Sequence, residues 1–109
     1  MPTYKLIVLT QPVEGREDEY NDWYQNVHLH DVAALDGVKR AQRYRLNDNV
    51  AGEEPFPYLA IYEIEADSPD AVIAEMRARP GTDLMKMSDA LSPRVYAAVY
   101  EEFGEPVES

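Results

Sequence analysis

The chain has 109 residues, of which 45% are hydrophobic, and these proportions predict a single packed domain over residues 1–109. Ten basic against 21 acidic side chains give a net charge of −11, which repels phosphate backbones and anionic lipids. Nucleic acids and membrane surfaces are therefore not expected as partners.

The sequence contains no cysteine, which excludes disulfides, thiolate metal sites and a cysteine nucleophile. Residues 1–10 lack the basic and long apolar regions of a signal peptide, and no segment is apolar enough to span a bilayer. A cytoplasmic location is the default expectation. Glycine-rich phosphate loops are also missing, since Gly81 and Gly104 are isolated, so no nucleotide cofactor is expected.

The first part of the chain predicts a strand, a long helix and a second strand. Residues Tyr4–Thr10 form an apolar, β-branched run that is typical of a central strand. Acidic residues crowd the start of a helical stretch from about Arg16 to Leu35, as the helix dipole favours, and Gly37 ends it. The next segment, Gly37–Leu46, alternates as a strand does, with one face formed by Val38, Arg40, Gln42 and Tyr44.

The second part predicts a strand, a helix and a last strand. Asn47–Pro57 is a turn-rich loop, and Pro57–Ala66 is predicted as the third strand. Ser68 and Pro69 are typical of a helix start, and this helix should run to about Arg79, where Pro80 and Gly81 stop it. A further short helix is predicted over Thr82–Leu91, and the last strand over Arg94–Phe103.

The predicted order, β-α-β-β-α-β, is that of ferredoxin-like α+β folds, in which helices cover one face of a four-stranded antiparallel sheet. The strands nevertheless carry large side chains on both faces. The uncovered face therefore needs another cover, and a second copy of the chain is the simplest one. We expect a homodimer.

The first helix carries the residues most indicative of chemistry. At about 100° per residue, Asp31 falls near the middle of the apolar stripe and His28 on its margin. Because residues three apart can meet, Asp31 could orient the His28 imidazole, which would then act as a general acid or base whose activity titrates between about pH 5 and 8. The alternative is structural: His28 packs at the rim of the core and Asp31 pairs with a strand arginine, which is Arg40, Arg43 or Arg45.

A metal site is not expected on this helix. His30 lies about 200° from His28, so the two imidazoles cannot share one ion. A site built on His28 and Asp31 would need ligands from elsewhere in the chain.

Five of the eight tyrosines fall on predicted strands, namely Tyr44, Tyr58, Tyr62, Tyr96 and Tyr100. Their rings can line an apolar pocket while their hydroxyls supply directed hydrogen bonds, as in sites for aromatic or polyketide-like ligands. The same residues are equally typical of a hydrophobic core or a dimer interface.

The segment Tyr20–Tyr44 combines an aromatic residue, the pair Trp23 and Tyr24, then His28, Asp31 and a glycine before a strand. This pattern resembles the first helix and second strand of the EthD-like branch of the dimeric α+β barrel superfamily. The resemblance implies a homodimer with facing sheets and a ligand pocket in each subunit. The chain departs from the pattern at His30, where a proline is expected.

Relatives of this kind include cofactor-independent oxygenases of aromatic polyketides, lactone isomerases of aromatic-compound catabolism and small cyclases. In such relatives the histidine that matches His28 commonly lines the pocket. Haem-binding members also exist, but the motif offers no axial ligand beyond His28, and we predict no cofactor.

Together, the residues and the resemblance predict a cofactor-independent isomerase, cyclase or oxygenase that acts on a small aromatic, lactone or polyketide-like molecule. The predicted catalytic residues are His28 and Asp31. The predicted ligand-binding residues are Trp23, Tyr24, Arg43, Tyr44, Tyr62 and Tyr96. Two alternatives stay open: a non-catalytic, ligand-binding or stress-associated dimer, and a structural dimer whose tyrosines fill the pocket completely.

Overall fold

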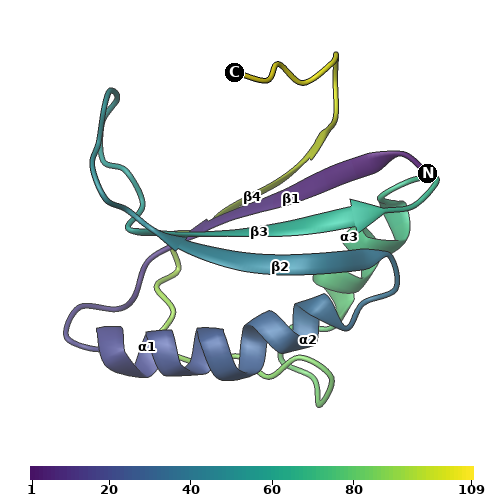
Figure 1. Cartoon of the computed structure of the whole chain (residues 1–109). Coiled ribbons are helices and arrows are strands. Elements are labelled where there is room, and N and C mark those ends of the chain that lie inside the picture. The colour runs from purple at the N-terminus through teal and green to yellow at the C-terminus, as the bar shows by residue number, and fades with distance from the viewer.

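The computed structural model describes residues 1–109 and shows a four-stranded sheet with helices on one face (Figure 1). The strands are β1 (Thr3–Thr10), β2 (Val38–Arg45), β3 (Tyr58–Glu65) and β4 (Tyr96–Glu101). A continuous helical segment follows β1 and consists of α1 (Glu17–Trp23), η1 (Tyr24–His28) and α2 (Leu29–Ala33), whereas α3 (Asp70–Ala78) follows β3. The predicted β-α-β-β-α-β order is confirmed.

The strands lie in the order β2-β3-β1-β4, and each neighbouring pair is antiparallel. The apolar strand β1 is therefore internal, as its composition predicts. This arrangement is the ferredoxin-like α+β fold. None of the helices combines the length and the apolar character that crossing a bilayer requires.

The two faces of the sheet differ in burial. Alternate side chains of β1 and β3 point toward the helices and are buried, namely Leu6, Val8, Thr10, Tyr58, Ala60, Tyr62 and Ile64. All of these except the polar Thr10 belong, with residues on the inner faces of the helices, to a core of 16 buried hydrophobic residues. Each large apolar side chain so buried stabilises the fold by about 1.5–3 kcal/mol relative to exposure. No other element of the chain covers the opposite face (Figure 1).

A β-bulge interrupts β2 between Val38 and Arg40. Val38 is buried, whereas Arg40 pairs with Glu63 and Tyr44 pairs with Leu59, on the uncovered face. The prediction that Val38 shares a face with Arg40 and Tyr44 is therefore wrong. One extra residue in a strand moves the side chains on either side of it to opposite faces of the sheet.

The short helix predicted over Thr82–Leu91 is absent, and this segment consists of turns and isolated bridges. Thr82 Oγ1 accepts a hydrogen bond from the N–H of Leu84 at 3.2 Å, so side chain and backbone satisfy each other locally without a helix. The fully buried side chain of Met85 anchors the segment in the core.

Met85→Ala is expected to lower the free energy of unfolding by about 2–5 kcal/mol, because truncation leaves a cavity beneath this segment. Urea denaturation followed by circular dichroism measures the loss. Leu84→Ala is the matched control, since the Leu84 side chain is 60% exposed. Equal losses in the two variants would contradict the anchoring role of Met85.

Candidate active site

The helical segment after β1 contains one π-helical turn, η1, between α1 and α2. The N–H of Leu29 bonds to the carbonyl of Tyr24, five residues earlier, instead of the four of an α-helix. A π turn of this kind inserts one extra residue and is frequent at functional sites.

The inserted residue rotates the second half of the helix relative to the first. His28, Leu29 and Val32 are buried, whereas Val27 is 37% exposed and Asp31 is only partly buried. The prediction that Asp31 lies in the middle of the buried stripe is therefore wrong, because it assumed 3.6 residues per turn throughout. His28 takes a central position in its place.

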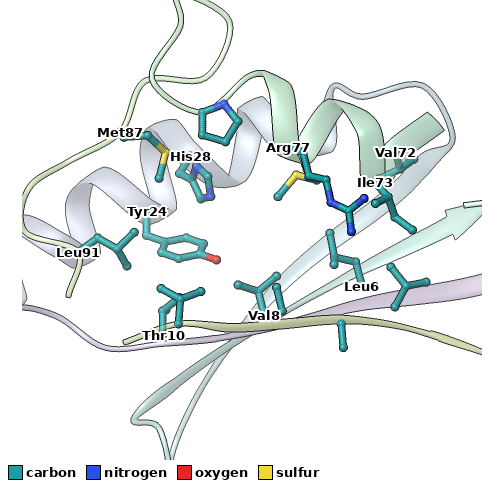
Figure 2. Close-up of a pocket in the computed structure, with 16 residues that line it drawn as sticks. Leu6, Val8, Thr10, Tyr24, His28, Val72, Ile73, Arg77, Met87 and Leu91 are labelled. Carbon is teal, nitrogen blue, oxygen red and sulfur yellow. The ribbon is translucent and has the colours of Figure 1, made fainter. Parts of the chain in front are cut away.

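A cavity of about 510 Å³ lies between this helix, α3, the sheet and the segment before β4 (Figure 2). Its lining is mainly apolar, and the residues that line it are Leu6, Val8, Thr10, Tyr24, His28, Val72, Ile73, Met76, Arg77, Pro80, Met87, Leu91, Val95, Ala97, Ala98 and Val99. Its volume is within the range of small-molecule sites. The tyrosines thus do not fill this space completely, which argues against the alternative of a structural dimer with a filled pocket.

His28 reaches this cavity from η1 and is held by two aromatic rings (Figure 2). Its imidazole stacks on the Trp23 indole, with 4.8 Å between ring centroids, and meets the Tyr24 ring edge-on at 4.9 Å. The residue is 7% exposed, and its Nδ1 has no hydrogen-bond partner in the protein. A buried polar atom without a partner is rare in folded proteins and marks a place where a ligand or water can bond.

Burial lowers the pKa of His28 to about 4, against the opposing effect of the nearby Asp31 charge. The imidazole is therefore neutral at pH 7, with one nitrogen able to accept a proton. Asp31 acts only through its charge, because no hydrogen bond or ion pair joins it to His28. The expected hydrogen bond between the two is absent: the His28 side chain is buried, whereas Asp31 is only partly buried.

Asp31 also forms no ion pair with Arg40, Arg43 or Arg45, so the alternative structural pairing is not present either. Arg40 lies 3.4 Å from Glu63 across the sheet, and Arg43 donates a hydrogen bond of 2.6 Å to Asn21 Oδ1.

Behind the cavity, a cluster of tyrosines packs around Arg43. The guanidinium lies over the Tyr24, Tyr58 and Tyr20 rings, at 4.7, 5.4 and 5.7 Å from their centroids. The Tyr24 and Tyr62 hydroxyls bond to each other at 3.3 Å, and burial raises the pKa of Tyr24 to about 12. These hydroxyls are neutral at physiological pH and are already engaged within the protein.

The structure separates the predicted ligand-binding residues. Tyr24 lines the cavity, and Trp23 supports His28 while donating a hydrogen bond of 3.0 Å to the Lys86 carbonyl. Tyr62 and Arg43 lie behind Tyr24, outside the lining. Tyr44 and Tyr96 are on the uncovered face, 47% and 46% exposed, because they pair with Leu59 and Leu9 there.

The cavity residues of α3 and of the segment before β4 were not predicted from the sequence. Val72, Ile73, Met76 and Arg77 follow the spacing of one helix face, and three of them are apolar. The sequence pattern that could have predicted a role for Arg77 is its position as a cation on an otherwise apolar face of the helix. No group of three or more histidine and carboxylate side chains is placed to hold a metal ion.

Comparison with solved structures supports the fold. The chain is similar to an EthD-family protein of Bacillus halodurans C-125, with a TM-score of 0.63 and 21% identity over 94% of this chain and 100% of that one. A proposed monooxygenase of Shewanella loihica PV-4 gives a TM-score of 0.61 at 15% identity, over 96% and 99% of the chains. A DABB-family protein of Mesorhizobium loti with a ferredoxin-like fold gives 0.57 at 13%, over 95% and 100%. The chain thus shares the ferredoxin-like α+β fold of these proteins, one of which is an EthD-family protein.

Sequence comparison finds less similarity to known proteins than structure comparison does. No protein-family model matches the chain. Core atranone cluster protein 1 of Stachybotrys chlorohalonatus is 36% identical over 62 residues, which cover 55% of this chain and 25% of that protein. The chain therefore spans about a quarter of the length of this curated relative.

The buried His28 makes stability depend on pH in a defined direction. Its pKa is about 4 in the folded chain and 6.5 as an ordinary value, so between these the unfolded chain binds a proton that the folded chain does not. The free energy of unfolding should therefore fall as pH drops from about 6.5 to 4, by on the order of 3 kcal/mol from this group.

Urea denaturation at pH 4 to 7 tests this on wild type, on His28→Gln and on His30→Gln as an exposed histidine control. Wild type and His30→Gln should lose stability relative to His28→Gln as pH falls. A difference between wild type and His28→Gln that stays constant over this range would show that His28 is not buried as a neutral group.

Proposed function

We propose that this chain is a cofactor-independent enzyme that moves a proton on a small aromatic, lactone or polyketide-like molecule bound in the cavity. His28 is the catalytic base. Isomerisation, cyclisation and oxygenation of such molecules share one step, the removal of a proton next to a carbonyl. The fate of the resulting carbanion distinguishes the three overall reactions.

The observation that carries the proposal is a neutral, unpaired imidazole in the wall of an apolar cavity. A base must be neutral to accept a proton and must lie within hydrogen-bond reach of the substrate. Trp23 and Tyr24 hold the ring in place without using its nitrogens. The negative charge of Asp31 then favours the imidazolium that forms during the transfer, as a positioning residue that acts through His28.

The low pKa of His28 changes the expected pH profile. Titration between pH 5 and 8 would require an ordinary imidazole, whereas burial lowers this pKa to about 4. The rate constant kcat/KM should therefore rise with a midpoint near pH 4 and be flat around neutrality.

The comparisons support an enzyme of small-molecule metabolism over a purely structural protein. One structural neighbour is a proposed monooxygenase, and the curated relative is named for an atranone cluster. The second candidate, a dimer that only sequesters a metabolite, rests on the same cavity and differs in having no turnover. For either candidate we propose that residues 1–109 form one domain and that the protein is cytoplasmic. The composition and the lack of cysteine are in keeping with this proposal.

Proton exchange in D₂O separates these two candidates. Anthrone and α-angelica lactone are suitable probes, because each carries an acidic C–H next to an unsaturated or carbonyl group. Wild type should accelerate exchange of that proton for deuterium, measured by NMR, and His28→Gln should reduce the acceleration by about 10²–10⁴-fold.

His30→Gln is the control and should exchange as wild type does. Undiminished exchange by folded His28→Gln would remove the assignment of His28. Binding of the probes without exchange by wild type would favour the sequestering protein.

We further propose that the uncovered face of the sheet joins two copies of the chain. Its middle is apolar, with Ile7 paired to Ile61 and Leu9 paired to Leu59. Tyr96 and Tyr100 on β4 are about half exposed and bond to each other at 3.3 Å. An exposed apolar face of this kind marks a protein–protein interface.

Two projecting segments flank this face. The loop between β2 and β3 and the chain after β4 both extend from the sheet on the side opposite the helices (Figure 1). Val50 in the loop, and Phe103 and Val107 after β4, are at least 95% exposed. Contacts with a second copy would give these apolar side chains the burial that one copy cannot supply.

Ile61→Asp should convert a dimer into a monomer, because it places a charge in the middle of the apolar face. Sedimentation equilibrium should give twice the chain mass of 12.4 kDa for wild type and a single chain mass for the variant. Val27→Asp, on the exposed side of η1, is the control and should stay dimeric. A wild-type monomer would refute the dimer.

A further inference from the structure

Arg77 is a cation without a partner in a strongly acidic chain. The residues three and four positions away on α3 and beyond it are Ile73, Ala74, Pro80 and Gly81, so no carboxylate is placed to pair with it. Arg79, two residues later, does pair with Glu75. The Arg77 guanidinium forms no hydrogen bond or ion pair with any other residue.

Arg77 is also the one charged side chain that lines the cavity. Figure 2 shows it reaching from α3 toward the sheet, on the side of Leu6. Its side chain stays exposed overall, so it meets water at the cavity's edge and needs no buried counterion. The helix dipole favours a cation in the last turn of α3, but it does not account for one that borders an apolar cavity.

The other polar groups of the lining are already engaged. Thr10 Oγ1 bonds to the Tyr20 hydroxyl, and the Tyr24 hydroxyl bonds to Tyr62. His28 and Arg77 are therefore the two polar lining side chains that make no hydrogen bond within the protein, one from each helical segment. A ligand that satisfies both has an apolar body, one proton-bearing group at His28 and one anionic group at Arg77.

We propose that Arg77 selects a substrate that carries a carboxylate on an aromatic or alicyclic body. Two parallel N–H donors of the guanidinium match the two oxygens of a carboxylate. The field of a chain with net charge −11 disfavours anions elsewhere on the surface. Arg77 offsets that field at this one cavity. The inference rests on the proposed function for the site, and it assigns the substrate class and the residue that determines it.

The test compares two probes of equal shape, 2-naphthoate and 2-naphthamide, at pH 7. Binding is measured by isothermal titration calorimetry. Wild type should bind 2-naphthoate about tenfold more tightly than 2-naphthamide, because a charge-assisted hydrogen bond replaces a neutral one. The preference should shrink as salt is added, since Arg77 is exposed.

Arg77→Gln should bind the two probes equally, and Arg77→Lys should keep part of the preference. Arg45→Gln is the matched control, since Arg45 is an exposed arginine that has no ion pair and lies outside the cavity lining. It should keep the full preference. Binding of both probes with equal affinity by wild type, binding of neither, or an unchanged preference in Arg77→Gln would overturn the proposal.

These outcomes are independent of the catalytic assignment. His28→Gln should lose proton exchange and keep the preference for 2-naphthoate. Loss of the preference in Arg77→Gln, together with exchange that is absent in wild type, would support the substrate class and reject the catalysis. Proton exchange that depends on His28, without any preference for 2-naphthoate over 2-naphthamide, would support the catalysis and reject the substrate class.

Discussion

The extra residue in η1 decides which side of the first helix meets the sheet. A regular α-helix through Tyr24–His28 would direct Val27 and Asp31 toward the core and leave a carboxylate to be buried, at a high cost in free energy. The π turn keeps Asp31 at the edge and brings His28 beneath the sheet, between Trp23 and Tyr24. The rest of the site depends on this rotation.

Burial by this packing explains the chemistry of the site. Removal from water keeps His28 neutral against the opposing effect of the Asp31 charge, and the aromatic rings hold the imidazole without hydrogen bonds. The cavity stays open beside it because β4 presents the small side chain of Ala97 to the helix side. Arg77, on a separate helix, supplies the positive charge that the apolar walls lack.

The tyrosines have different roles on the two faces of the sheet. Tyr20, Tyr24 and Tyr62 are fully buried between the first helical segment and the sheet, and Tyr24 lines the cavity. Tyr96 and Tyr100 are exposed on the other face, where the dimer is proposed to form. Residue type did not distinguish these roles, since tyrosine suits a pocket, a core and an interface alike. For the tyrosines on strands, the register of the sheet determines which face each side chain occupies.

The sequence by itself determined the order of the elements and hence the ferredoxin-like fold, because strand alternation, the helix start at Ser68 and the stop at Gly37 are local signals. It also singled out His28. Tertiary structure decided the rotation of the first helix, the faces of β2, the loss of a helix over Thr82–Leu91 and the place of Arg77 at the cavity. The π turn and the β-bulge each insert one residue, which turns every later side chain by about 100° in a helix or to the other face in a strand. Such insertions are favoured by what the core gains in burial, and a local sequence pattern does not record that gain.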